Sequence, residues 1–372
     1  MSPETIVPFV DLRAATAARR GAIDAAIAEI LDAGWYVLGD AGRRFEAAFA
    51  DWIGAEQAVG VASGTDAIEV ALRGLGIGPG DEVVTQANTC VPTVAGIERT
   101  GAIPVLCDVD PEGAVMDPTS LAGALSPRTR AVVPVHLYGQ CADTKAIRAV
   151  VEGRGIHVVE DCAQAHGAAF QGELAGTMGT AGAFSFYPTK NLGALGDGGA
   201  IVTHDASLAE RLRSLRQYGQ VDRYRHVLRG VNSRLDELQA AVLSVRLPGL
   251  EEANRRRAAI ANAYFEALSD TAVRPLPALP SRRHVFHLFV VRTESRERLR
   301  AELAKRGVQT LIHYPIPVHR HEPYADLAKG PVSLKYSERL AREILSLPLY
   351  PEMSDAQVEH ATHAAAEAAA ST

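Results

Sequence analysis

Lys190 and Asp161 are the two residues of this 372-residue chain whose types and positions point most directly to chemistry. Lys190 is the single lysine of the segment FSFYPTKNLGALGDGGAIVT, in which an apolar run precedes it and a glycine-rich turn follows it. A surface lysine needs no such setting. Burial lowers the pKa of an ammonium group and leaves a neutral amine that can attack a carbonyl carbon. The segment therefore predicts a nucleophilic lysine.

Asp161 follows the apolar run IHVVE, at the point where a predicted strand ends. Ligands of open parallel sheets bind outside the carboxyl ends of the strands. On its own this residue also fits a helix cap or a structural ion pair, but one predicted strand, AGAFSFY, joins its neighbourhood to Lys190. Pyridoxal phosphate needs this pair. A lysine forms a Schiff base with its aldehyde, and a carboxylate keeps its pyridine nitrogen protonated.

A phosphate site is the next requirement, and two segments offer one. In GVASGTDAIEVAL, Ser63, Gly64 and Thr65 stand between a predicted strand and a predicted helix, where amides and the helix dipole attract an anion. Simple capping of the helix by Ser63 explains the same residues. Ser185, at the end of the strand before Lys190, can bond the phosphate from the other side. The run GALGDGG fits either a close backbone approach to the cofactor or an ordinary turn between strands.

The elements that must position these residues follow from hydrophobic patterning. Between about residues 58 and 203, short β-rich apolar runs alternate with helical patterns, which predicts a mainly parallel sheet covered by helices. From residue 206 the pattern is helical, with a long helix over about 250–268. We expect a large domain over 1–249 and a smaller one over 250–372. The alanine-rich end, HATHAAAEAAAST, predicts a fraying helix.

Composition excludes several classes of function. The hydrophobic share of 47%, the charged share of 22% and the net charge of -6 are ordinary for a globular enzyme and give no reason to expect nucleic acid or a membrane surface. No apolar stretch is long enough to span a membrane, and the first residues lack a signal-peptide pattern. The four cysteines lie far apart, which disfavours zinc and disulfides and fits the cytoplasm.

The histidines show no metal-binding spacing, so we expect no metal. His157 lies inside a predicted strand and is expected to pack there. His166 follows the Asp161 segment closely, and its position fits either the lining of a cofactor site or the core.

The chain resembles the pyridoxal phosphate-dependent nucleotide-sugar aminotransferases of fold type I, the DegT/StrS family. The resemblance runs from GWYVLG at Gly34 to SLPLYPEMS at Ser354. It is carried by the ordered blocks VASGTDAIEVAL, GPGDEVVTQANT, PVHLYGQ, VVEDCAQAHGA, FSFYPTKNLGALGDGGAIVT, RGVNSRLDELQAAVL and IHYPIPVH. It implies an α/β fold with a large cofactor-binding domain, a smaller C-terminal α/β domain and a homodimer with shared active sites.

The resemblance also implies a role for each matching position. Lys190 would form the Schiff base and Asp161 would contact the pyridine nitrogen. The remaining positions would bind the phosphate (Gly64, Thr65 and Ser185), the ring hydroxyl (Gln164), one ring face (Ala163), the phosphate of the partner subunit's cofactor (Asn232) and the substrate (Tyr218, Tyr224, Tyr314 and His319). Two positions depart from the family pattern. Cys90 stands where many members have an aromatic residue stacked on the cofactor, and Asp40-Ala41 replaces the usual Pro-Glu.

The implied activity is transfer of an amino group from L-glutamate, or less favourably glutamine, to a keto sugar through pyridoxal and pyridoxamine phosphate. The residues around Lys190 favour amination at C-3 of a dTDP-linked 3-keto-6-deoxyhexose, for an antibiotic sugar or a surface polysaccharide. Amination at C-4 or of an inositol-type ketone stays open, as does a non-catalytic regulator that binds the cofactor. A sugar dehydratase of the same fold would carry histidine in place of Lys190. A Rossmann dehydrogenase would need a GxGxxG motif after its first strand, and the chain has none.

Overall fold

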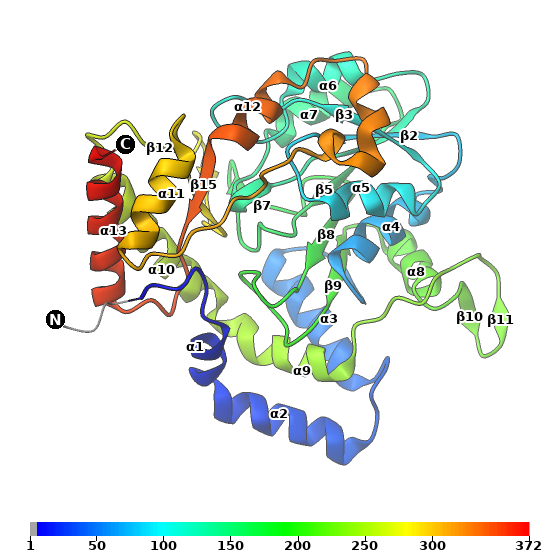
Figure 1. The fold of residues 1–372 in the computed structure, drawn as a ribbon. Coiled ribbons are helices and arrows are strands. Elements are labelled where there is room, and N and C mark those ends of the chain that lie inside the picture. Colours follow the sequence, from blue (N-terminus) through cyan, green and yellow to red (C-terminus); the bar gives the residue numbers. More distant parts are fainter. Residues whose placement is uncertain (1–5, 372) are drawn as a thin grey trace.

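The computed structural model describes residues 6–371, and a seven-stranded sheet of order β1-β9-β8-β5-β4-β2-β3 lies at its centre (Figure 1). Its strands are β1 (Gln57–Val61), β2 (Glu82–Gln86), β3 (Ile103–Cys107), β4 (Thr129–Val133), β5 (His157–Asp161), β8 (Ala181–Ser185) and β9 (Gly199–Thr203). β9 runs antiparallel to both β1 and β8, and the other neighbouring pairs are parallel. The prediction of a mainly parallel sheet is confirmed.

Helices cover both faces of this sheet, because side chains that alternate along each strand are buried on opposite sides. On β4, Ala131 and Val133 belong to one buried cluster and Val132 belongs to another. The first face packs against α4 (Gly64–Gly74), α5 (Val91–Glu98) and α8 (Ala206–Leu215). The second packs against α3 (Asp40–Ile53), α6 (Pro118–Ala124), α7 (Thr144–Val151) and α9 (Glu237–Arg246). The strands are therefore apolar on both sides, as their continuous hydrophobic runs predict.

The C-terminal part of the chain builds a second sheet with a buried cluster of its own. The strands β12 (Arg274–Pro275), β14 (Phe289–Arg292) and β15 (Ile344–Leu347) pair antiparallel in the order β12-β14-β15. They pack with α10 (Leu250–Ala267), α11 (Arg296–Lys305) and α13 (Asp355–Ala370). The long helix expected over 250–268 is thus present as α10. The domain boundary between residues 249 and 250 stays a prediction.

The alanine-rich end forms a helix, as predicted, but the burial of its alanines contradicts the expectation that this helix frays. α13 begins with a capping box in which the Ser354 and Gln357 side chains each accept a hydrogen bond from the other's backbone amide. Its alanines at positions 361, 364, 365, 368 and 369 are buried in the same cluster as residues of α10. Small side chains let the helix lie close to its neighbour, so it is fixed by packing rather than left to fray.

Peripheral elements complete the molecule. β6 (Ala169–Phe170) forms a short hairpin with β7 (Glu173–Leu174), and its pairing with β13 (Arg282–Arg283) joins the large and the C-terminal parts of the chain. α1 (Leu12–Ala17) and α2 (Arg20–Ala33) lead to α3, and α12 (Lys335–Glu343) precedes β15. The hairpin of β10 (Gln220–Asp222) and β11 (Arg225–His226) stands out from the body (Figure 1). Among the described residues, no helix is long and apolar enough to cross a membrane.

Candidate active site

The expected functional residues meet at one edge of the central sheet. Asp161 is the last residue of β5 and Ser185 is the last residue of β8, and the two strands are parallel neighbours with Asp161 opposite Ala183. Lys190 follows β8 in a turn closed by its own amide, which donates to the Tyr187 carbonyl at 2.8 Å. The parallel pairing therefore brings the carboxylate and the lysine turn to the same place.

The Asp161 carboxylate is buried and held in a fixed direction. Its Oδ2 accepts a hydrogen bond from Thr93 Oγ1 at 2.9 Å, and its Oδ1 accepts one from the Ala163 amide at 3.1 Å. Burial raises the pKa of Asp161, while these two hydrogen bonds and the charge of Lys190 oppose that rise. The carboxyl group is therefore poised to gain from a further cationic partner.

Lys190 is partly buried, and burial lowers the pKa of its ammonium group. Asp161, and to a smaller degree Cys90, oppose this shift by favouring the charged form. The result is an amine that loses its proton more easily than an exposed lysine and that lies within electrostatic reach of a buried carboxylate. This is the state that the sequence predicts for a nucleophilic lysine.

Cys90 lies beside Lys190 and Tyr314, at the start of α5. Burial raises the pKa of the Cys90 thiol, and a hydrogen bond with Tyr314 opposes the rise. Gln164 fixes the tyrosine, because its Nε2 donates to Tyr314 Oη at 3.1 Å while its Oε1 accepts from the Tyr138 amide at 2.7 Å. At the position where many family members have an aromatic residue, the Cys90 thiol thus contacts the Tyr314 hydroxyl from the C-terminal part of the chain.

The turn after β1 packs closely against the end of β8. Ser63 caps α4 by accepting a hydrogen bond from the Asp66 amide at 3.1 Å, so the capping interpretation is confirmed. A Cβ added to Gly64 would lie 2.6 Å from the Ser185 Cβ, closer than side chains approach. Only glycine therefore lets the amides at the start of α4 and the Ser185 hydroxyl converge on one point, which is suited to an anion.

Four of the residues implied by the resemblance do not join this cluster within one chain. Asn232, Tyr218 and Tyr224 lie on the surface near the β10–β11 hairpin. His319 is buried, and its Nε2 lies 3.0 Å from Glu338 Oε1. The role of each in binding the cofactor or the substrate stays a prediction.

Several residues that position the site went unnoticed in the sequence. Thr93 carries no motif signal and is found only through its contact with Asp161. Glu160 accepts hydrogen bonds from the amides of Gly176, Met178 and Gly179 at 2.7 to 2.9 Å. The one possible hint was the charge of Glu160 next to Asp161 in an otherwise apolar run.

The remaining partner of Glu160 is His136 Nε2, 2.7 Å from Glu160 Oε2, while His136 Nδ1 accepts from the Ala142 amide at 3.1 Å. Together with Cys162, this buried pair has the composition of a metal site. However, both ring nitrogens and both carboxylate oxygens already have protein partners, so hydrogen bonding explains the cluster without an ion.

The other uncertain histidines are placed by packing. His166 is fully buried, and its ring lies 5.4 Å from that of Phe184 and 5.8 Å from that of Phe186. His166 therefore packs in the core, and it also lies near the site, because the charge of Lys190 adds to burial in lowering its pKa. His157 is the first residue of β5 and is partly buried, as expected for a packing residue. The GALGDGG run connects β8 to β9 as a turn between strands.

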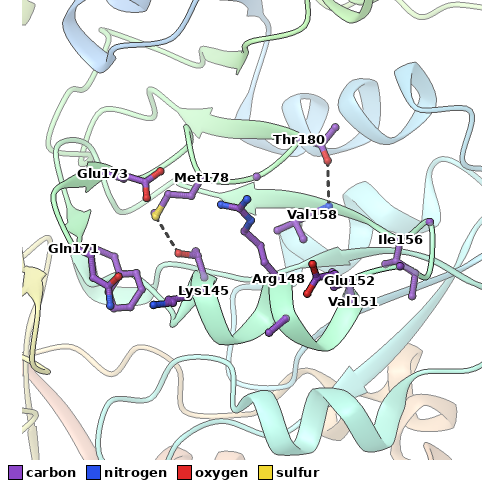
Figure 2. A pocket seen from close by; sticks show the side chains of 16 residues that line it. Lys145, Arg148, Val151, Glu152, Ile156, Val158, Gln171, Glu173, Met178 and Thr180 are labelled. Atoms are coloured by element: carbon purple, nitrogen blue, oxygen red, sulfur yellow. Dashed lines mark hydrogen bonds between the residues drawn. The ribbon is translucent and has the colours of Figure 1, made fainter.

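A surface cavity of about 880 Å³ lies at the opposite end of β5 (Figure 2). Ile156 and Val158 line it at the start of the strand, whereas Asp161 stands at its end. Its charged side chains are of both signs, with Lys145 and Arg148 on α7 and Glu173 on β7. The cavity is therefore separate from the lysine site and shows no preference for a charged ligand.

Comparison with known proteins identifies relatives along nearly the whole chain. Residues 18–365 match the model of the DegT/DnrJ/EryC1/StrS aminotransferase family. The chain is 49% identical over 352 residues to a dTDP-3-amino-3,4,6-trideoxy-alpha-D-glucose transaminase of Streptomyces venezuelae, covering 94% of this chain and 93% of that protein. It is 48% identical over 357 residues to the erythromycin biosynthesis sensory transduction protein EryC1 of Saccharopolyspora erythraea, covering 95% and 97%.

A crystal structure of DesV from S. venezuelae, in complex with a ketimine intermediate, superposes with a TM-score of 0.95. The two chains are 48% identical, and 98% of each is covered. Sequence and structure agree over the same range, so the chain belongs to the DegT/DnrJ/EryC1/StrS aminotransferase family.

Proposed function

We propose that this aminotransferase uses pyridoxal phosphate to move an amino group from L-glutamate to a dTDP-linked 3-keto-6-deoxyhexose. The observation that carries the proposal is the Lys190–Asp161 pair at the sheet edge. There the lysine pKa is lowered by burial and a buried carboxylate lies within electrostatic reach of it. Among cofactors, pyridoxal phosphate requires this combination of an amine nucleophile and a carboxylate partner.

The residues at the sheet edge fit this cofactor. The close approach of Gly64 to Ser185 at the start of α4 suits its phosphate, and the Asp161 carboxylate, desolvated and oriented by Thr93, suits its ring nitrogen. Thr65 would add a hydroxyl at the start of α4. Gln164 would lie near the ring hydroxyl. Ala163 and Cys90 would flank the ring, and the small thiol leaves more open space on that face than an aromatic ring would.

The bound cofactor would supply an electron sink for the carbon that loses its proton. The chain itself would do the rest. The Lys190 Nζ atom, deprotonated because of its burial, would bond the aldehyde and later carry a proton between the two carbons that exchange it. The Asp161 carboxylate would hold a proton on the ring nitrogen, and Thr93 Oγ1 and the Ala163 amide would keep that carboxylate in place.

Amination at C-3 is the regiochemistry that we propose, because the S. venezuelae relative is named as a dTDP-3-amino sugar transaminase. Tyr314 and His319 would lie at the mouth of the substrate site. C-4 nucleotide sugars and inositol-type ketones are the alternative acceptors. Pyridoxamine phosphate is the form of the cofactor that would carry the amino group between donor and acceptor.

We further propose a homodimer whose two active sites are shared. Asn232 is exposed and would reach the phosphate of the partner subunit's cofactor, with Tyr218 and Tyr224 beside it. Exposed aromatic side chains support a protein partner, since Tyr218 is 48% exposed and Tyr224 is 81% exposed. We place the enzyme in the cytoplasm, which the four unpaired cysteines support.

The test is the visible absorbance of the purified protein with pyridoxal phosphate, before and after L-glutamate, followed by a 3-keto and then a 4-keto dTDP sugar. We expect glutamate to bleach the band of the lysine-bound cofactor and the 3-keto sugar to restore it. Lys190→Ala should lack that band and steady turnover. Restoration by the 4-keto sugar alone would show that the regiochemistry is wrong while the chemistry is right.

A second candidate function is a regulator that binds the cofactor without turnover, which the name of the S. erythraea relative favours. The same experiment separates the two functions. A clear absorbance band that no amino donor bleaches would support the regulator. Bleaching by glutamate followed by recovery with a keto sugar would exclude it.

A further inference from the structure

The side chain of Asn191, the residue after Lys190, bonds two segments of the chain that are far from it in sequence and, through one of them, a third. Its Nδ2 donates to Asn254 Oδ1 on α10 at 2.8 Å and to the Val285 carbonyl at 3.1 Å. Its Oδ1 lies 3.0 Å from His287 Nδ1. Asn254 in turn donates from Nδ2 to the His166 carbonyl at 2.9 Å. One amide side chain thus joins the lysine turn to α10, to the segment before β14 and to the loop after β5.

The direction of each hydrogen bond in this network is fixed. The Asn191 nitrogen faces two oxygens that can only accept, so its own oxygen must face His287. His287 Nδ1 therefore carries the proton and donates it. His287 and Asn254 are both more than nine-tenths buried, so water cannot replace a lost partner at no cost.

His287 stays neutral in this position. Burial lowers its pKa well below the usual value, and the charges of Lys190 and Arg257, with His313 and His166 nearby, lower it further. It is therefore a constant hydrogen-bond donor near neutral pH and does not switch with the proton state of the active site.

We propose that Asn191, His287 and Asn254 are positioning residues that set the direction of the Lys190 side chain. They fix the backbone of the turn one residue beyond the lysine, and two of the three come from the C-terminal part of the chain. The proposal rests on Lys190 being the lysine that binds the cofactor. It assigns to the C-terminal segment a direct part in holding the nucleophile, in addition to any contact with the sugar.

The test compares His287→Leu with His287→Asn. Asparagine places an amide nitrogen close to the position of the histidine Nδ1 and can still donate to Asn191, whereas leucine fills similar space without a donor. For His287→Leu we expect kcat for the glutamate half-reaction to fall by about 10- to 100-fold, because misplaced reacting groups lose orientation. KM for glutamate should change little. His287→Asn should recover most of the rate.

A readout independent of rate is the pH titration of the bound cofactor's absorbance. We expect its midpoint to shift by about half a unit or more in His287→Leu, since the direction of Lys190 sets the environment of the titrating nitrogen, and to return toward wild type in His287→Asn. Unchanged midpoints and rates in His287→Leu would overturn the proposal. A protein that is merely less stable would lose melting temperature in both variants without separating their midpoints.

Asn191→Asp gives a second variant, because it replaces the amide donors by an acceptor that faces Asn254 Oδ1 and the Val285 carbonyl. We expect a larger loss of rate than in His287→Leu, and Asn262→Asp on the exposed side of α10 serves as the matched control. Equal behaviour of the Asn191 and Asn262 variants would also overturn the proposal. If wild type itself showed no lysine-bound cofactor band, the proposed function would fail and not the network.

Discussion

Two ionisable side chains, Lys190 and Asp161, carry the chemistry that we propose, and burial shifts their pKa values toward one another. Burial favours the neutral form of each, while their mutual attraction favours the charged forms. At Asp161 burial outweighs the hydrogen bonds from the Ala163 amide and from Thr93, which stabilise the carboxylate and so reduce the rise of its pKa. Loss of either hydrogen-bond donor would therefore raise the pKa of Asp161 further.

Asp161→Asn should keep the shape of the site while removing the charge. Without an anion beside it, the cofactor ring nitrogen would lose its proton and the electron sink would weaken. We expect kcat for the glutamate half-reaction to fall by about 10²- to 10⁴-fold, with the lysine-bound cofactor band still present. Asp51→Asn, on the exposed side of α3, is the control. Wild-type rates in Asp161→Asn would contradict the assigned role.

The buried His166 ring should make the free energy of unfolding depend on pH. Burial lowers its pKa from 6.5 to about 3, so below pH 6.5 the unfolded chain binds a proton that the folded chain refuses. Stability contributed by the neutral ring is complete above pH 6.5 and is lost as the pH falls toward 3. Between pH 6.5 and pH 4, wild type should therefore lose more free energy of unfolding than His166→Leu. The difference between the two proteins should be up to about 1.4 kcal/mol per pH unit.

The measurement for His166 is urea unfolding of the cofactor-free protein at several pH values. His204→Gln is the control, because it also removes a histidine, but from the surface and not from the core. Parallel pH profiles for wild type and His166→Leu would show that the buried ring does not govern acid sensitivity.

At the scale of elements, β5 is the strand that positions the site, and Glu160 anchors its end. Glu160 and Asp161 point to opposite sides of the strand, as successive residues must. Glu160 gathers three amides of the 176–179 loop and the His136 ring on one side, while Asp161 faces the active site on the other. The His136 amide also donates to the Asp161 carbonyl at 3.0 Å. The hydrogen bonds of Glu160 therefore hold the end of β5 from the side opposite the active site.

Glu160→Gln should weaken this anchoring of β5. Both carboxylate oxygens of Glu160 accept hydrogen bonds from buried donors. In glutamine one of these oxygens becomes an NH₂ group, which cannot accept, so at least one buried donor would lose its partner. We expect a loss of about 3 kcal/mol in the free energy of unfolding, measured by urea denaturation of the cofactor-free protein. Glu173→Gln, at an exposed position of β7, should change stability by less than about 0.5 kcal/mol. Equal stability of both variants would contradict the role of Glu160 as an anchor.

At the scale of the whole molecule, one chain holds only part of the site that we propose. Lys190, Asp161 and Ser185 converge at the sheet edge, but Asn232, Tyr218 and Tyr224 lie on the surface near a hairpin that stands out from the body (Figure 1). In the proposed dimer this hairpin, which carries Tyr224 and four charged or basic side chains (Asp222, Arg223, Arg225 and His226), would pack on a second copy. The symmetry of such a dimer would complete both sites at once.

Co-expression of two inactive variants tests this sharing. Lys190→Ala removes the nucleophile from its own chain, and Asn232→Ala removes the phosphate contact that would belong to the partner's site. In a mixed dimer, one site combines the intact Lys190 of one chain with the intact Asn232 of the other. Random pairing should therefore restore about a quarter of wild-type sites, measured as turnover of glutamate and keto sugar. No recovery beyond the sum of the two separate variants would argue against shared sites.

The sequence by itself determined the central sheet, the turn before α4 and the placement of Lys190 and Asp161 beside each other. These features depend on short stretches of sequence: apolar runs predict the strands, and glycine and serine predict the turn. Parallel strands then bring their carboxyl ends to one edge of the sheet. The ordered motifs also determined the aminotransferase family, since several blocks in sequence are far more specific than one.

Only the tertiary structure decided which residues hold those groups in place. Thr93 on Asp161, Tyr314 beside Cys90 and the Asn191 network join segments that are far apart in the chain. A hydrogen bond between distant segments produces no hydrophobic periodicity and no fixed motif spacing, so these contacts cannot be recognised in the sequence. The buried alanines of α13 were misjudged for the same reason: whether small side chains fray or pack depends on the neighbouring helix, which local composition does not specify.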